Sequence, residues 1–366
     1  MVQVKNILVF CLPGIGDALL FTPAFRALKR DLPHARVTAL CMYSGTAQIL
    51  RHDSNVDEVL FFDFIKQGIL RTLKFCRALR ARNFDTLILG YPSNRLEYNI
   101  IARFIGTGAR IGHRYKNLDI VCGNFLCTHS VVEDDALSNI EENLRLVGLV
   151  TGNSGYDPHV TMTLPEDAAR MADQWLVRHR ILGRRIVGIH PGGSVRKNHL
   201  HKRWQPHKFA ELVKTIRARC NAVVLLFGGP DEERLLSEIS PATPLEVFHV
   251  LNDDLLLTSG IISKCDHFVS NDSALMHIAG ALQVPTTAIF GPTSRDWVRI
   301  PGAPRTEVAQ EMDCQPCFRY SPRPLRCRFG DFRCLDRISA QEVADVVCAS
   351  LGRLQRACES PIPVEA

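Results

Sequence analysis

Several features that would assign this 366-residue sequence to a special class are missing from it. No segment reaches the roughly 18 uninterrupted apolar residues that a membrane-spanning helix needs. The first apolar run is short and ends at Pro13-Gly14, so we expect no secretory signal peptide. The sequence contains no P-loop motif, no low-complexity tract and no short-period repeat. These absences leave an ordinary globular protein.

The composition supports that class, with 46% apolar and 22% charged residues. The length predicts two domains. The formal net charge is only +6, but it is unevenly distributed: 17 Lys and Arg stand against 8 Asp and Glu between Lys5 and Lys116. The excess predicts an anionic partner for the first half, either a phosphorylated substrate or a membrane surface.

The thirteen cysteines show no disulfide-like framework, and nine of them are scattered. We therefore expect a reducing compartment and a cytoplasmic protein. The inner face of the cytoplasmic membrane is the second expected location. Cys314, Cys317, Cys327 and Cys334 form a C-x2-C-x9-C-x6-C cluster whose spacing suits a structural zinc. The second pair lacks the tight spacing of a zinc knuckle. We predict no bound metal, and a thiolate-bound metal stays the alternative.

A strand, a turn and a helix open the chain. The apolar run 7–12 predicts a buried parallel strand, and residues 18–30 have nearly helical apolar spacing. Between them lies Pro13-Gly14-Ile15-Gly16-Asp17, which places Asp17 at the entry of the helix, where the helix dipole favours a carboxylate. Asp17 is either an N-cap or a general base at the carboxyl end of a strand, where open α/β sheets bind ligands.

Strands and helices alternate through both halves, which predicts two parallel, doubly wound sheets. The expected strands are 36–42, 59–62, 86–90, 185–190, 222–227, 267–270 and 285–290. The expected helices are 66–82, 166–179, 206–219, 274–282 and 339–354, with a linker at 151–158. On the helix 66–82, Arg71, Lys74 and Arg77 share a face, which is either solvated or binds an anion.

Three loops in the second half have the composition of anion sites, each at the end of an expected strand. They are His190-Pro-Gly-Gly-Ser194, Gly228-Gly-Pro-Asp-Glu232 and Asn271-Asp-Ser273, and Lys202 and Arg203 follow the first loop. Glycines allow backbone N–H groups to approach an anion, and Ser273 opens a helix whose amides suit a phosphate. Together the loops predict a nucleotide or nucleotide-sugar site.

The histidines of the second half have less specific interpretations. His199 and His201 lack further ligands for a metal. His277 lies one turn after Ser273 on the same helix face and is either a core residue or part of the nucleotide site. A dinucleotide fingerprint is incomplete at the first turn, because Leu19 stands at the third glycine position and no acidic residue ends the second strand.

The motifs Gly14-Ile-Gly-Asp17, His190-Pro-Gly-Gly-Ser, Lys202-Arg-Trp, Asn271-Asp-Ser-Ala-Leu-Met-His277 and Phe290-Gly-Pro-Thr occur in order along the chain. In this combination the sequence resembles glycosyltransferase family 9, the ADP-heptose:lipopolysaccharide heptosyltransferases. The resemblance implies a GT-B arrangement of two Rossmann-like domains. The acceptor-binding domain would cover residues 1–165 and the nucleotide-sugar-binding domain residues 166–338. Residues 339–366 would form a helix that packs back on the first domain, followed by a frayed tail.

The resemblance also implies the site residues. Asp17 matches the catalytic aspartate. The donor-binding positions are Ser194, Lys202, Glu232, Asp272, Ser273, Ala274, Leu275 and His277. Arg71, Lys74 and Arg77 would meet an anionic lipopolysaccharide acceptor. No cofactor is expected beyond ADP-heptose as the donor substrate, and nucleic acid is not expected as a partner, because few aromatics accompany the arginines near the cysteine cluster.

The implied reaction is an inverting, metal-independent transfer of heptose from ADP-heptose to a hydroxyl of the lipopolysaccharide inner core. Three alternatives stay open. In the first, the same enzyme class acts on a protein or a small glycoside as acceptor. In the second, the chain is a nucleotide-dependent oxidoreductase or epimerase. In the third, it is a binding module without catalytic activity.

Overall fold

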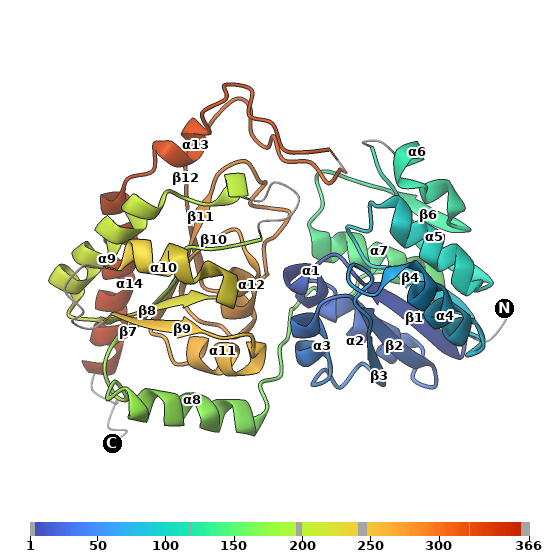
Figure 1. The fold of residues 1–366 in the computed structure, drawn as a ribbon, viewed down its shortest axis with the longest axis horizontal. Helices are drawn as coiled ribbons and strands as arrows, with labels where there is room; N and C mark the ends of the chain where they lie inside the picture. The colour runs from blue at the N-terminus through green and yellow to red at the C-terminus, as the bar shows by residue number, and fades with distance from the viewer. Residues whose placement is uncertain (1–3, 117–118, 195–199, 241–246, 322, 360–366) are drawn as a thin grey trace, which may run out of the picture. The chain divides into compact units, whose positions relative to one another are not determined.

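The computed structural model describes residues 4–116, 119–194, 200–240, 247–321 and 323–359. The chain divides into two compact units (Figure 1). The first unit holds Met1–Pro165, Ser294–Gly302 and Phe318–Leu325; the second holds Glu166–Thr293, Ala303–Cys317 and Arg326–Ala366. Two short segments from the second half of the sequence therefore belong to the first unit. The expected second domain, residues 166–338, was uninterrupted and included both segments.

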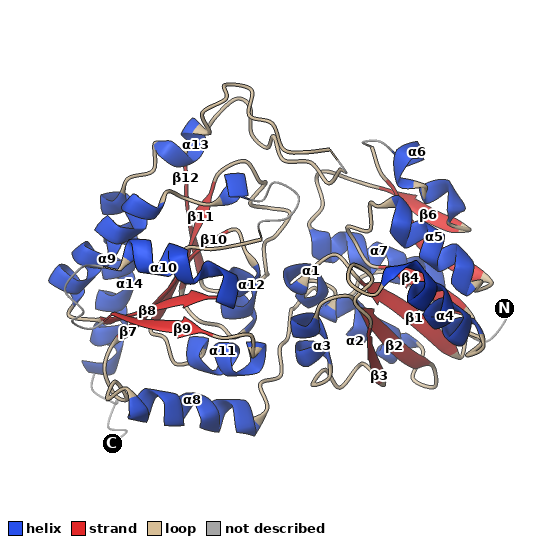
Figure 2. Cartoon of the chain, in the orientation of Figure 1, coloured by secondary structure: helices blue, strands red, loops and turns tan. Residues whose placement is uncertain are grey.

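The first unit is built on a six-stranded parallel sheet with the order β3-β2-β1-β4-β5-β6 (Figure 2). Its strands are β1 Asn6–Cys11, β2 Arg36–Cys41, β3 Glu58–Phe61, β4 Thr86–Leu89, β5 Ala109–Arg114 and β6 His129–Val132. Its helices are α1 Ile15–Leu19, α2 Thr22–Asp31, α3 Ser44–Leu50, α4 Gly68–Arg80, α5 Leu96–Ile105, α6 Asp119–Cys122 and α7 Asn139–Thr151, with a 3-10 turn η1 at Asn124–Leu126.

The second unit repeats this topology with the sheet order β12-β11-β10-β7-β8-β9. Its strands are β7 Ile186–His190, β8 Val223–Gly228, β9 Val247–Leu251, β10 His267–Asn271, β11 Thr286–Phe290 and β12 Arg305–Ala309. Its helices are α8 Glu166–Arg178, α9 Pro206–Cys220, α10 Glu233–Ile239, α11 Leu255–Ile262, α12 Ala274–Ala281, α13 Arg333–Asp336 and α14 Ala340–Glu359, with a 3-10 turn η3 at Pro230–Glu232. The predicted pair of Rossmann-like parallel sheets is confirmed.

The first helix of the chain differs from its prediction. The apolar pattern 18–30 predicted one helix, but α1 ends at Leu19 and α2 begins at Thr22. Pro23 lies in the first turn of α2, where a missing backbone N–H costs nothing. Gly14 is the N-cap of α1, and Asp17 is the third residue of the helix. Asp17 is therefore not the N-cap.

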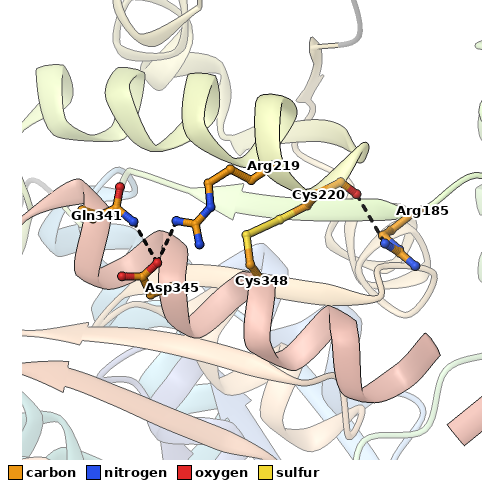
Figure 3. The surroundings of a disulfide bond; sticks show 6 residues. All are labelled: Arg185, Arg219, Cys220, Gln341, Asp345 and Cys348. Carbon is orange, nitrogen blue, oxygen red and sulfur yellow. Dashed lines mark hydrogen bonds and ion pairs between the residues drawn. A yellow bond between two sulfur atoms is a disulfide. The ribbon is translucent and has the colours of Figure 1, made fainter. Parts of the chain in front are cut away.

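The last helix belongs to the second unit, whereas the resemblance implied that it packs on the first. The α14 helix packs beside α9 and against β10, β11 and β12, and Val343, Ala344 and Val347 are fully buried in the core of that unit. A disulfide joins Cys220 at the end of α9 to Cys348 in α14 (Figure 3). Arg219 also pairs with Asp345 at 2.7 Å. The cysteine spacing predicted no disulfide framework, and this bridge departs from that expectation, because its two cysteines are 128 residues apart and no local spacing links them.

The disulfide generates a prediction about stability. A cross-link that closes a loop of more than 100 residues reduces the conformational entropy of the unfolded chain, so Cys348→Ser should lower the free energy of unfolding by roughly 3–5 kcal/mol. Guanidinium unfolding of the air-oxidised protein measures the effect. Dithiothreitol should bring the wild type to the level of the variant. Cys127→Ser, at a free cysteine, serves as the control. Equal stability of oxidised wild type and Cys348→Ser would contradict the prediction.

Candidate active site

Each sheet changes the direction of its strand order once, between β1 and β4 in the first unit and between β7 and β10 in the second. Connections leave in opposite directions at such a point and open a crevice at the carboxyl ends of the two strands, where α/β proteins bind ligands. Asp17 follows β1, and Asp272 and Ser273 follow β10. The topology therefore places one candidate site in each unit.

A small pocket surrounds Asp17 in the first unit. It is lined by Phe10, Cys11, Pro13, Asp17, Ala18, Phe21, Gly90 and Tyr91. Gly90 and Tyr91 directly follow β4, so the pocket spans the point where the strand order reverses. Gly90 must lack a side chain, because a Cβ there would approach the carbonyl oxygen of Phe10 to 2.8 Å. One carboxylate thus lies in a pocket that is otherwise apolar and aromatic.

Tyr91 connects this pocket to a buried polar network. Its hydroxyl donates to Glu133 Oε1 at 2.7 Å, and Glu133 lies directly after β6. The backbone N–H of Tyr91 donates to Asn143 Oδ1 at 2.8 Å. Burial raises the pKa of Glu133, against hydrogen bonds from Tyr91 and the N–H of Lys116. The ring of Tyr91 also contacts Tyr320, one of the residues that the second half of the sequence contributes to the first unit.

In the second unit Glu232 is the centre of the polar contacts. Glu232 Oε1 accepts from the N–H of Gly193 at 2.9 Å and from Arg203 at 2.8 Å, and Oε2 accepts from the N–H of Gly229 at 3.1 Å. His190 Nε2 lies 3.4 Å from Oε2 and donates to it, since an ionised carboxylate only accepts. One largely buried carboxylate, whose side chain is 13% exposed, therefore joins the loops that follow β7 and β8.

The charge of Glu232 is stabilised by this environment. Burial on its own raises the pKa of a carboxyl group, but the hydrogen bond and charge of His190 and the N–H groups of Gly193 and Gly229 outweigh burial and lower the pKa of Glu232 to about 2. Gly192 makes the arrangement possible, because a Cβ at this position would lie 2.0 Å from Glu232 Oε1.

Lys202 and Asp272 form a second buried pair, with Nζ 2.8 Å from Oδ2. Burial favours the protonated form of Asp272, but the charge and the hydrogen bond of Lys202 lower the pKa of Asp272 to about 2. Burial lowers the pKa of His277 to about 4, with Arg305 and Lys202 acting in the same direction and Asp272 against them. His277 is therefore neutral at pH 7. Its Nδ1 is buried without a hydrogen-bond partner among the described residues, which makes it available to a ligand.

The α12 helix presents its N-terminus at the same edge. Ser273 is its N-cap, but the Ser273 side chain does not cap the helix; its hydroxyl lies 2.9 Å from His190 Nδ1 and 2.9 Å from Ser270 Oγ. Ala274 and Leu275 follow in the first turn of the helix, and Leu275 is buried. Unpaired amides at a helix N-terminus attract an anion.

The remaining predicted positions are dispersed. Ser194 follows Gly193 and is exposed, and His199 lies outside the described residues. His201 stacks on Phe332 with ring centroids 4.3 Å apart. Arg71, Lys74 and Arg77 are all exposed on α4, which confirms that they share an outer face. None of the three lines the pocket around Asp17.

The described part of the chain bears on two further expectations, a metal site and a membrane span. Within the described ranges, no three or more His, Cys, Asp or Glu side chains are grouped as metal ligands, and this includes Cys314, Cys317, Cys327 and Cys334. No helix in the described part of the chain has both the length and the apolar character needed to cross a membrane.

Residues 72–325 match the model of the family described as glycosyltransferase family 9 (heptosyltransferase). The chain belongs to glycosyltransferase family 9. Lipopolysaccharide heptosyltransferase 3 of Escherichia coli is 24% identical over 286 residues, which cover 76% of this chain and 81% of that protein.

Solved structures of family 9 share the fold. The ADP-heptose lipopolysaccharide heptosyltransferase II of E. coli superposes with a TM-score of 0.74 and 19% identity, covering 96% of this chain and 100% of that one. A family 9 glycosyltransferase from Veillonella parvula DSM 2008 gives a TM-score of 0.78 and 18% identity, covering 96% and 99%. At these identities the superpositions support the GT-B-type fold of two Rossmann-like sheets.

Sequence reasoning missed some residues that the family 9 fold brings to these two edges. Arg203 was noted only as a cation near the loop, yet it binds Glu232 directly. Asn271, at the end of β10, connects the loop after β7 to the start of α9. Its Nδ2 donates to the carbonyl of Pro191, and its Oδ1 accepts from the N–H of Trp204. Tyr91 and Glu133 gave no signal, because they lie in unremarkable loops 42 residues apart.

The close approach at Gly192 predicts a sensitive position. Gly192→Ala should destabilise the protein by about 1–3 kcal/mol, because the new Cβ displaces Glu232 from its donors. Chemical unfolding measures the change. The control is Gly352→Ala in α14, where a Cβ meets nothing within 4 Å and the better helix former should stabilise by up to about 1 kcal/mol. A Gly192→Ala protein as stable as wild type would contradict the prediction and show that Glu232 or the loop can move aside without a loss of stability.

Proposed function

We propose that this family 9 protein transfers heptose from ADP-heptose to a hydroxyl of the lipopolysaccharide inner core, with inversion and without a metal. The observation that carries the proposal is that two units with the same strand order have chemically different sites at corresponding positions. One sheet edge holds a single carboxylate in an apolar pocket, and the other holds a cation, glycine-rich loops and a helix N-terminus. Relatives named as lipopolysaccharide heptosyltransferases support the choice of donor and acceptor.

The second unit binds the donor. The ammonium of Lys202 and the amides at the start of α12 offset the charge of the diphosphate, which grows as ADP departs. The neutral ring of His277 offers Nδ1 as an acceptor or donor to the nucleotide. Glu232 has a positioning role, because its oxygens are already used in holding Gly193, Gly229 and Arg203.

The first unit binds the acceptor, and Asp17 is the general base. Its carboxylate removes the proton from the acceptor hydroxyl as that oxygen bonds to the anomeric carbon and the bond from this carbon to ADP breaks. A single displacement inverts the anomeric centre and needs one base and a stabilised leaving group. The pocket around Asp17 supports this role, since it lies at the carboxyl ends of β1 and β4, where α/β sheets bind their ligands.

Arg71, Lys74 and Arg77 serve the acceptor as a cationic face rather than as part of the pocket. The inner core carries phosphates and carboxylates that such a face attracts over several ångströms. Because the acceptor is anchored in a lipid bilayer, we place the enzyme in the cytoplasm, in peripheral contact with the inner membrane.

Replacing the proposed base tests the mechanism. Asp17→Asn should reduce turnover about 10²–10⁴-fold, the usual contribution of a general base, while ADP affinity stays unchanged. Transfer from ADP-heptose to a truncated lipopolysaccharide core measures turnover, and calorimetry measures ADP binding. Glu97→Gln, at another acidic residue in the first turn of a helix in the same unit, should keep full turnover. Full activity of Asp17→Asn would rule out the base.

Replacing the proposed phosphate ligand tests the donor site. Lys202→Ala should weaken ADP binding at least tenfold, because it removes a buried cation from the phosphates. The loss of its partner also destabilises Asp272, so thermal unfolding is measured in parallel and Lys202→Arg is included to retain the charge. Lys214→Ala, an exposed lysine of α9, is the control. An unchanged ADP titration of folded Lys202→Ala would remove Lys202 from the site.

A further inference from the structure

The outer face of α4 combines strongly exposed apolar side chains with cations. Ile69 is 74% exposed and Leu70 80% exposed, and Ile65, just before the helix, is 56% exposed. Leu70, Lys74 and Arg77 follow the spacing i, i+4, i+7 and so lie along one stripe of the helix. We call the six residues Ile65, Lys66, Ile69, Leu70, Lys74 and Arg77 the docking surface.

The apolar members of the docking surface do nothing for the core. The helix is held to the unit by its other face, where Cys76 and Leu79 are buried and Phe75 stacks on Phe62 with ring centroids 4.2 Å apart. Exposing neighbouring Ile and Leu side chains to water is unfavourable, and at these positions they add nothing to the free energy of folding. Such residues mark a surface that is covered by a partner.

The charge around these side chains has one sign. Residues 64–84 hold six Lys and Arg and no Asp or Glu. Lys66, Lys74 and Arg77 are exposed, and no ion pair joins them to a carboxylate of the described residues. Long basic side chains around exposed aliphatic residues are complementary to an anionic bilayer, because the cations meet phosphates while the aliphatic groups enter the acyl boundary. A free phosphorylated sugar would leave the aliphatic groups in water.

The docking surface begins at the carboxyl edge of the first sheet. The α4 helix follows β3, and Asp17 follows β1, and all strands of this sheet are parallel. A second apolar pair follows β5 at the same edge, where Ile120 is 79% and Val121 57% exposed. The segments that carry these exposed apolar residues therefore begin at the same sheet edge as the loop that carries Asp17.

We infer that the docking surface binds the surface of an anionic phospholipid bilayer, with Ile65, Ile69 and Leu70 entering the headgroup region and Lys66, Lys74 and Arg77 contacting lipid phosphates. The inference rests on the proposed function in one respect: a lipid-anchored acceptor explains why such a surface lies on the acceptor unit. Lipid binding itself requires neither donor nor acceptor.

Vesicle sedimentation tests the inference with the full-length protein. The wild type should bind vesicles of phosphatidylethanolamine and phosphatidylglycerol at low salt, and binding to pure phosphatidylcholine should be at least tenfold weaker. Ile69→Ser/Leu70→Ser should lose at least tenfold in binding to the anionic vesicles. Lys74→Glu/Arg77→Glu should lose more than tenfold, since each cation near an anionic surface contributes about fivefold. ADP titration checks that each variant is folded.

Matched controls come from the second unit. Val177→Ser/Leu182→Ser removes two aliphatic side chains that are 58% and 54% exposed, and Lys214→Glu/Arg234→Glu makes the same change in net charge. Both should bind vesicles like the wild type. The inference is overturned if the wild type ignores anionic vesicles or if the controls lose as much as the test variants. It is also overturned if Ile69→Ser/Leu70→Ser alters only the oligomeric state in solution, which would make α4 a contact between copies.

These vesicles contain no sugar acceptor, so failure to bind them leaves heptosyl transfer untouched. Conversely, a protein that transfers no heptose but binds anionic vesicles through α4 would retain the docking surface and lose the proposed function.

Discussion

The hydrogen bonds of the largely buried Glu232 carboxylate are the interactions on which the loop geometry of the second unit depends. The carboxylate comes from the short turn after β8, yet it holds the loop after β7 through Gly193 and neutralises Arg203. A buried charge is stable only when its hydrogen bonds are satisfied, so each of its donors is required for the others to stay in place. Gly192 is part of the same constraint, because any side chain there would occupy the position of the carboxylate. The loop is thus fixed in shape before a ligand arrives.

The parts of the fold that could be predicted are those with buried, continuous apolar strands. Strands β1, β4, β7 and β8 fall within one residue or so of the predicted runs, because both faces of these strands are covered. Strands β5, β6, β9 and β12 were missed. The last three lie at the edges of their sheets, and β5 lies inside its sheet. All four carry polar residues, for example Arg110 and His113 in β5 or Arg305 and Glu307 in β12, so none forms a continuous apolar run. The break between α1 and α2 was also missed, since the apolar spacing continues across it.

The candidate site shows the same division. Glycine-rich turns after buried strands identified the loops at 190–194, 228–232 and 271–273, because turn residues and strand ends are local signals. Which side chain of a loop turns to which partner is not local. Tyr91 reaches Glu133 and Cys220 reaches Cys348 through the tertiary fold, and the second half of the chain supplies Tyr320 to the first unit. No spacing rule connects residues that the sheet order alone brings together.

The two units have the same strand order, so the fold cannot be what separates their roles. The difference lies in the residues that follow the strands at the point where the order reverses. After β1 and β4 the chain places Pro13, Gly90 and Tyr91 in a small pocket around one carboxylate. After β7 and β10 it places Gly192, Gly193 and a helix N-terminus beside a buried lysine. Amides and a lysine favour a diphosphate. This difference between the two edges supports the proposal that the nucleotide binds to the second unit, and it leaves the acceptor hydroxyl to the carboxylate of the first unit.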